Sequence, residues 1–197
     1  MLRCSVGEVR KSKAKGWKED ENRKNEDECK PQQEAVVEKP WTLPYDAQLN
    51  NLIKETFKSV PPLKDEVEMY TTLAKLVCDA MGGPVDIEKQ HDLLWELHLS
   101  ELKVEMQSNI IPIGKIKKGT YYHRALLFKV LTDRIGLSCS LVRGHYNRAW
   151  NEVLLPSTTT RATGFYPHLQ TYIIDLMHKP GTLMKCGTPA AVQYQTI

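Results

Sequence analysis

The feature that most constrains this chain is the apolar segment that follows Thr120. Hydrophobic side chains fill every position but one from Ala125 to Leu131, and Ile135 adds another one turn later. A helix that is apolar nearly all round must be buried on most of its sides. Thr120 can cap the start of such a helix, and Gly136 can end it. We therefore predict a central buried helix from about Tyr121 to Ile135, with the rest of the domain packed around it.

Three amphipathic segments precede this central helix. Asp46 can cap the first helix, whose inner face is expected to carry Leu49, Leu52, Ile53 and Phe57, and Pro61-Pro62 ends it. A second helix is predicted over 65–81, stopped by Gly82-Gly83-Pro84, with inward-facing Tyr70, Leu73, Ala74, Leu76, Val77 and Met81. A third is expected to start near Asp86 and to carry Leu93, Leu94, Leu97 and Leu102.

Strand-like runs replace helical periodicity after the central helix. We predict strands over 139–143, 149–155 and 171–177, with a polar loop over 156–164 between the last two. Helices that are followed by antiparallel strands are typical of an α+β domain.

Domain limits follow from a change in composition. Residues 1–39 contain ten Lys or Arg and nine Asp or Glu with few large apolar residues, so we predict a disordered charged tail or linker there. The folded domain is predicted over 40–186, and 187–197 form a C-terminal tail. A charged linker followed by one domain suggests a piece of a larger protein.

Composition also narrows the functional class. The formal net charge is only +3, and basic and acidic residues are intermixed, which argues against nucleic acid as a partner. None of the five cysteines lies in a C-x-x-C pair, so we expect free thiols in the cytoplasm rather than disulfides or structural zinc. No run of 18 apolar residues is present, so no membrane partner is expected. We predict no cofactor.

Several short motifs together resemble one known family. They are Ile111-Pro-Ile-Gly114, Gly119, His123-Arg-Ala-Leu-Leu-Phe-Lys129, Asp133, Gly136-Leu137, Leu141-Val-Arg-Gly144, Ile174-Asp-Leu-Met177 and Pro180-Gly181. The resemblance spans roughly residues 49–185. It is to the peptidase-like domain shared by plant Raf-like ethylene-response and disease-resistance kinases and armadillo repeat-containing protein 3, and Arg148-Ala-Trp-Asn-Glu-Val153 fits the animal member best.

This resemblance implies a papain-like or transglutaminase-like core, in which a cysteine, a histidine and a carboxylate catalyse acyl transfer. The matching positions hold Tyr121, Arg148 and Asp175. A phenol titrates near pH ~10 and an arginine cannot accept a proton, so the pair lacks both nucleophile and base. We therefore expect a pseudoenzyme that binds other proteins, with Asp175 free to pair with Arg148.

The candidate binding residues around this vestigial cleft are Tyr122, His123, Arg124 and Trp150. His123 is alternatively a core histidine that donates to a carbonyl or carboxylate. Tyr121, Tyr122 and Trp150 either line an open cleft or fill the space that a substrate once occupied.

Two other classes of function remain as alternatives. A cysteine-type acyl hydrolase or peptidase with a rearranged site would use Cys139 as nucleophile, with His145 near enough to swing toward a site, although a buried inert thiol is the simpler interpretation of Cys139. A phosphate-binding turn at Gly114-Lys-Ile-Lys-Lys-Gly119 lacks the P-loop spacing. His91 and His98 share a helix face but have no third ligand, so no metal site is predicted.

Overall fold

The computed structural model describes residues 45–60, 63–156 and 169–196, all of which belong to one compact unit, Thr42–Ile197. The predicted tail over 1–39 and most of the polar loop over 156–164 lie outside the described residues. The helices are α1 (Ala47–Ser59), α2 (Glu66–Ala80), α3 (Trp95–Met106), α4 (Tyr121–Ile135) and α5 (Pro189–Thr196), with short 3-10 helices η1 (Ile87–Leu93) and η2 (Ile113–Lys115). The strands are β1 (Ser140–Arg143), β2 (Ala149–Pro156), β3 (Leu169–Ile174) and β4 (Leu183–Lys185).

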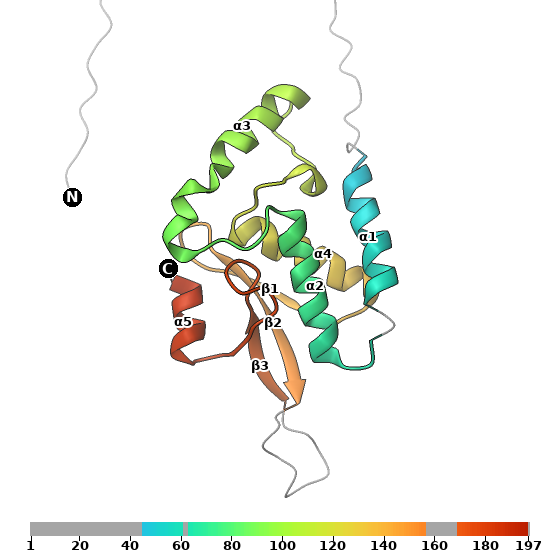
Figure 1. The fold of residues 1–197 in the computed structure, drawn as a ribbon, viewed down its shortest axis with the longest axis vertical. Coiled ribbons are helices and arrows are strands. Elements are labelled where there is room, and N and C mark those ends of the chain that lie inside the picture. Colours follow the sequence, from blue (N-terminus) through green and yellow to red (C-terminus); the bar gives the residue numbers. More distant parts are fainter. Residues whose placement is uncertain (1–44, 61–62, 157–168, 197) are drawn as a thin grey trace, which may run out of the picture. The chain divides into compact units, whose positions relative to one another are not determined.

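The four strands form one antiparallel sheet in the order β1-β2-β3-β4. Helix α4 packs against β1 and β2, while α1 and α2 pack against α4 (Figure 1). This arrangement confirms an α+β domain with the predicted central helix between the N-terminal helices and the sheet. The core is made of side chains from α2, α4, β2 and β3, including Leu73, Val77, Phe128, Leu131 and Val153.

Helix α4 begins and ends at the predicted residues. The Thr120 side chain and the His123 ring form a capping box with the two backbone N–H groups at the helix start. Gly136 ends the helix in the left-handed region, at φ 79°, a conformation that glycine adopts without strain. The buried residues of α4 come from most of its sides, including Ala125, Leu127, Phe128 and Leu131.

The first two helices agree with the sequence except at Phe57. Asp46 caps α1 by accepting a hydrogen bond from the Leu49 N–H at 2.8 Å, and its second oxygen accepts one from the Gly114 N–H at 2.8 Å. The prediction that Phe57 faces inward is wrong, because its side chain is exposed and Thr56 is buried in its place. The Thr56 hydroxyl tolerates burial because it donates to the Leu52 carbonyl at 2.8 Å.

Three other predicted elements differ from the structure. The third helix is split at Leu94, whose left-handed backbone (φ 41°) separates η1 from α3. The predicted strand over 171–177 ends at Ile174, because the Asp175 carboxylate binds the following backbone amides and turns the chain. The predicted tail over 187–197 contains α5, whose Ala191 and Tyr194 are buried.

Helix α5 packs on the sheet face opposite α4. Alternation along β3 points Ile174 toward the α4 core and Ile173 toward a second cluster with Tyr121, Met177, Ala191 and Tyr194. The start of α4 and the helix α5 therefore meet in this second cluster.

Candidate functional site: the start of helix α4

Tyr121 and Arg148 lie together at the start of α4. Tyr121 is the first residue of the helix, and its ring is buried in the second cluster. Arg148 immediately precedes β2, and its guanidinium carbon lies 3.7 Å from the centroid of the Tyr121 ring. This is a close cation–π contact. The two positions at which the family resemblance implied a cysteine and a histidine thus face each other.

Asp175 belongs to the same region but does not contact Arg148. Its carboxylate accepts hydrogen bonds from the backbone N–H groups of Met177 (2.7 Å), His178 (2.9 Å) and Lys179 (2.8 Å). The expected Asp175–Arg148 ion pair is not among those of the described residues. Asp175 instead fixes the loop between β3 and β4, which returns through Gly181 at φ 90°.

His178 is a residue of this site that sequence reasoning missed. Its Nδ1 atom lies 2.6 Å from the carbonyl oxygen of Val85, which can only accept a hydrogen bond. The proton therefore belongs on Nδ1, and Nε2 accepts from the Tyr121 hydroxyl. The available signal was its position in the loop that follows Asp175, three residues further along the chain.

The phenol of Tyr121 stays protonated at neutral pH. Burial raises its pKa above the ordinary tyrosine value, and this effect outweighs the opposing influence of the Arg148 guanidinium. A protonated phenol is a weaker nucleophile than a phenolate.

A small pocket of about 160 Å³ opens beside this pair. The lining residues come from η1, α4, the β3–β4 loop, β4 and α5, and include Tyr121, Asp175, His178, Met184, Ala190 and Tyr194. Tyr194 packs edge-on against Tyr121, with ring centroids 5.3 Å apart, and its hydroxyl accepts from the Leu176 N–H at 3.0 Å. Helix α5 therefore supplies one wall of the pocket.

The four candidate binding residues have separate surroundings. The Tyr122 hydroxyl accepts a hydrogen bond from Arg143 at 2.8 Å. Trp150 is half-buried and donates to the Glu152 carboxylate at 3.0 Å. The Nδ1 atom of His123 accepts from the Thr120 N–H at 3.2 Å, and no hydrogen bond from its ring to a carbonyl or carboxylate is among those of the described residues. Burial lowers the pKa of His123, which favours the neutral ring that this cap requires.

Arg124 is fully buried and has no access to a ligand. Its guanidinium donates to the carbonyl oxygens of Gly119 (2.8 Å), Leu176 (2.9 Å) and Met81 (3.0 Å). A further hydrogen bond of 3.1 Å reaches the Cys78 sulfur. The predicted binding role of Arg124 is therefore incompatible with this structure, in which the residue joins α4 to α2 and the β3–β4 loop.

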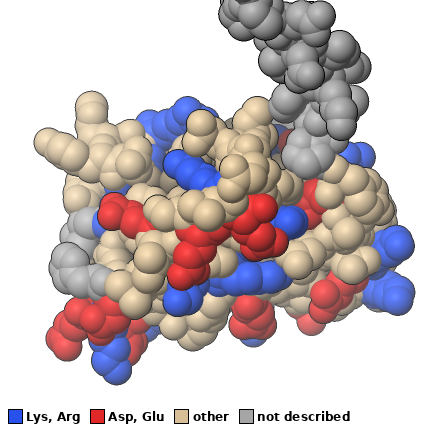
Figure 2. All heavy atoms as spheres, turned by 90° about the horizontal axis from the view of Figure 1, so that it is seen from above, with Lys and Arg blue, Asp and Glu red and all other residues tan. Residues whose placement is uncertain are grey.

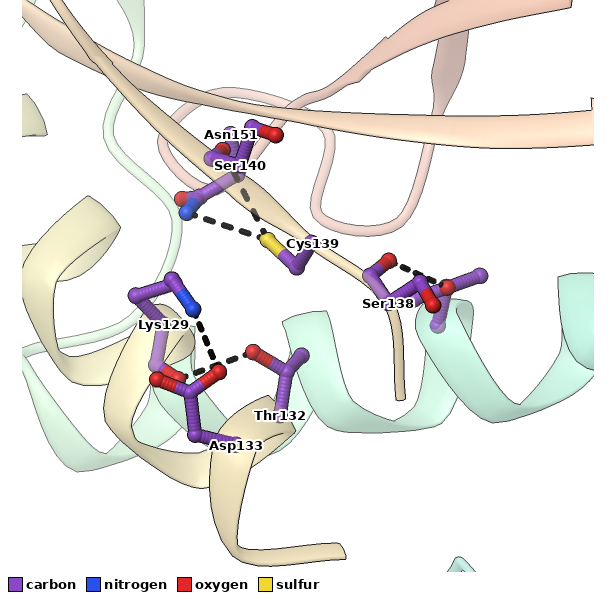
Figure 3. Close-up of polar contacts among 8 residues, drawn as sticks. Lys129, Thr132, Asp133, Ser138, Cys139, Ser140 and Asn151 are labelled. Atoms are coloured by element: carbon purple, nitrogen blue, oxygen red, sulfur yellow. Dashed lines mark hydrogen bonds and ion pairs between the residues drawn. The ribbon is translucent and has the colours of Figure 1, made fainter. Parts of the chain in front are cut away.

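Cys139 packs against the main core cluster, whereas Tyr121 belongs to the second cluster. The half-buried sulfur of Cys139 accepts a hydrogen bond from the Asn151 amide at 3.4 Å, and its thiol donates to the Ser140 carbonyl at 3.7 Å (Figure 3). Burial raises the pKa of its thiol. These surroundings describe an unreactive thiol. His145 lies in the turn after Gly144, next to Tyr146.

Other chemistries find little support in the described part of the chain. No group of three or more His, Cys, Asp or Glu side chains in it could hold a metal ion. His98 Nε2 accepts from the Lys117 N–H at 3.0 Å. None of the described helices is long and apolar enough to cross a membrane.

Comparison with known proteins identifies a matching family and several similar proteins. The family model described as EDR1/CTR1/ARMC3, peptidase-like, matches residues 24–184. Human armadillo repeat-containing protein 3 is 48% identical over 165 residues, which cover 83% of this chain and 19% of that protein. The Arabidopsis thaliana serine/threonine-protein kinase CTR1 is 34% identical over 151 residues, or 76% of this chain and 17% of the kinase. The probable serine/threonine-protein kinase SIS8 of the same plant is 37% identical over 117 residues, or 59% of this chain and 11% of the kinase.

The chain therefore spans about a fifth or less of the length of these relatives. No solved structure matches it. The family resemblance inferred from the motifs is confirmed, and the match begins before the predicted domain boundary at residue 40. The chain belongs to the EDR1/CTR1/ARMC3 peptidase-like family.

Proposed function

We propose that this domain is a catalytically inactive member of its peptidase-like family, with a papain-like arrangement of helix and strands, and that it binds other proteins. The observation that carries the proposal is the stacking of Arg148 on Tyr121 at the start of α4. In a papain-like enzyme this helix end would hold a thiolate, and the facing position would hold the base that activates it. A phenol with a raised pKa and a guanidinium can fill neither role.

Asp175, at the carboxylate position of the triad, has hydrogen-bond partners of its own. Asp175 accepts hydrogen bonds from three backbone amides of the β3–β4 loop, and no hydrogen bond between it and a histidine or arginine side chain is among those of the described residues. Its role in this proposal is to position the loop that carries His178.

The alternative, a hydrolase that uses Cys139, is less well supported. The raised pKa of this thiol and its Asn151 partner favour a structural residue. Turnover of peptide or amide substrates by the unmodified chain that is lost on Cys139→Ala would favour this alternative over the pseudoenzyme.

In the proposed role the domain serves as a scaffolding module of a larger cytoplasmic protein. A cytoplasmic location is compatible with the free thiols of Cys78, Cys139 and Cys186. The pocket beside Tyr121 is the proposed contact region for a partner protein, because its lining is largely apolar and α5 leaves it open to solvent.

The catalytic half of the proposal is tested by restoring the missing groups. The Tyr121→Cys and Arg148→His double variant should show faster alkylation of residue 121 by iodoacetamide than the Tyr121→Cys single variant, since a nearby imidazolium lowers the pKa of a thiol. Peptide mass mapping reports residue 121 separately from the natural cysteines. Equal rates would mean that the two positions do not form the proposed pair.

A matched control exists one residue along the helix. Tyr122 also contacts an arginine, Arg143, whose guanidinium lies 5.1 Å from the ring centroid. The Tyr122→Cys and Arg143→His pair should gain less reactivity, because it lies outside the family's catalytic positions. A larger gain at Tyr122 would contradict the assignment of the site.

The binding half is tested at the pocket wall. Ala190→Trp adds a bulky ring to a residue that lines the pocket, and Val192→Trp adds the same ring to the exposed side of the same helix. A partner that uses the pocket should be lost from the first variant and retained by the second. Retention by both variants would exclude the pocket as the contact region.

A further inference from the structure

Helix α3 has apolar side chains on two opposite sides. Leu99 and Leu102 face the core, and Leu102 is buried. Leu97 and Val104 face away and are 56% and 69% exposed. Because an ordinary surface helix keeps its apolar residues on one face, a helix with two apolar faces is expected to be covered on both.

The exposed apolar residues are spaced along one side of the helix. Leu97 and Val104 are seven residues apart, which places them two turns from each other on the same face. They line one depression together with Ser100 and Glu101. Leu97 also lines a depression that reaches Leu94 and Trp95 at the start of the helix, and Val104 lines one at its end. The three depressions therefore follow one another along the exposed face of α3, and we call this strip the α3 groove.

The surroundings of the α3 groove are acidic in a chain that is basic overall. Among the residues that line the three depressions, three are acidic (Glu96, Glu101 and Glu105) and one is basic (Lys103), whereas the whole chain has a formal net charge of +3. Figure 2, which views the molecule from above the α3 end of Figure 1, shows acidic side chains across the middle of this face, with basic side chains beside them. Glu105 pairs with Lys115 at 3.9 Å, whereas Glu96 and Glu101 make no ion pair among the described residues.

We propose that the α3 groove docks an amphipathic helix of a partner protein, with apolar residues two turns apart and a rim of Lys or Arg. The apolar side chains of that helix would cover Leu97 and Val104, and its basic rim would face Glu96 and Glu101. A second copy of this chain fits less well, because two α3 helices face to face would bring like charges together. The groove shares no lining residue with the pocket beside Tyr121, so the proposal holds whether or not that pocket binds a protein.

The test uses the full chain and a defined probe. A fluorescent peptide of about 15 residues, long enough to form a helix, carries leucines on one helical face and lysines elsewhere, and its binding is measured by fluorescence anisotropy. The Leu97→Ser and Val104→Ser double variant should weaken binding by at least about tenfold, because it removes two apolar contacts from the interface. Leu97 and Val104 are solvent-exposed, as are the two positions of the control variant described next, so both double variants should fold normally.

The matched control is Leu154→Ser with Val192→Ser, again one leucine and one valine, which are 52% and 47% exposed elsewhere. This variant should bind within about twofold of the natural sequence. In the charge test, Glu96→Gln with Glu101→Gln should weaken binding and reduce its dependence on salt. Glu55→Gln with Glu68→Gln, on exposed parts of α1 and α2, should do neither.

Three results would overturn the proposal. The first is a titration in which the peptide does not bind, or in which the control variant weakens its binding as much as Leu97→Ser with Val104→Ser does. The second is equally tight binding of an all-lysine peptide, which would leave a purely electrostatic surface. The third is self-association of the chain in sedimentation experiments that Leu97→Ser with Val104→Ser abolishes, which would make a second copy the occupant.

Discussion

At the scale of single residues, Arg124 is the polar centre of the fold. Three carbonyl oxygens from three different segments and the Cys78 sulfur receive its hydrogen bonds in a site closed to water. A planar guanidinium can serve several acceptors at once, which a lysine ammonium at the same place cannot do with the same geometry. The His-Arg string that marks the family therefore includes a residue whose function in this structure is architectural.

Arg124→Met is expected to lower the free energy of unfolding by roughly 3 to 5 kcal/mol, because it leaves buried carbonyl groups without donors. Urea denaturation measures this loss. Arg134→Met, at an exposed position of the same helix, should change stability by less than about 0.5 kcal/mol. Similar losses in both variants would mean that the Arg124 hydrogen bonds contribute little.

Tyr70 links stability to alkaline pH. Its ring is buried, and its hydroxyl donates to the Ser138 carbonyl at 2.7 Å. Burial, with a smaller effect of the Glu66 carboxylate, raises its pKa from 10.0 to about 12. Since the folded state holds this proton longer than the unfolded state, the stabilisation is complete below pH 10 and is lost as the pH rises from 10 toward 12.

Between about pH 9 and about pH 11, the free energy of unfolding should therefore fall further in the natural sequence than in Tyr70→Phe, by about 1 kcal/mol. The comparison is needed because burial also raises the pKa values of Tyr121 and Tyr194, which remain in both proteins. Parallel pH profiles for the two proteins would show that Tyr70 ionises normally.

At the scale of elements, α4 holds the layers together and Leu127 lies at its centre. Its side chain is buried between the sheet and the N-terminal helices. Leu127→Ala should cost roughly 2 to 5 kcal/mol, whereas Leu126→Ala, at a half-buried position beside it, should cost less. Thermal and urea unfolding measure both. A loss under about 1 kcal/mol for Leu127→Ala would argue against a central position of this helix.

Helix α5 is held by its own small cluster. Ala191 is buried against the sheet, while its neighbour Ala190 is exposed. Ala191→Arg should lower the melting temperature by several degrees, because a long charged side chain cannot fit that contact. Ala190→Arg adds the same side chain without this cost. If both variants melt like the natural sequence, α5 is not docked on the sheet in solution.

At the scale of the whole molecule, one core is built from segments that are far apart in the sequence. Its contributions run from Leu49 in α1 to Leu183 in β4. The family match begins at residue 24, whereas the described fold begins at residue 45. The family match includes residues 24–44 in the domain, whereas a domain that starts at residue 45 leaves them out.

A chain that starts at residue 45 should unfold at the same urea midpoint and with the same m value as one that starts at residue 24, because every core residue in the described part of the chain lies at Leu49 or later. A lower midpoint or a smaller m value for the shorter chain would show that residues 24–44 belong to the folded domain.

The sequence by itself determined the elements whose signals are local. The capped apolar run at Thr120 and the Asp46 cap defined α4 and the start of α1, because capping and hydrophobic periodicity act within a few residues. The motifs also identified the family, and they brought Tyr121 and Arg148 forward as positions that face each other.

Only the tertiary structure decided what these residues contact. Asp175 matches the carboxylate position of the triad, but its oxygens accept hydrogen bonds from three backbone amides of its own loop. His178 is not part of a periodic sequence pattern. It lies in a loop 57 residues after Tyr121 and forms a hydrogen bond with the Tyr121 hydroxyl. Arg124, which has the sequence character of a surface ligand, is buried because distant carbonyl groups converge on it. Hydrogen bonds between remote segments depend on how the layers pack, and no local pattern encodes that packing.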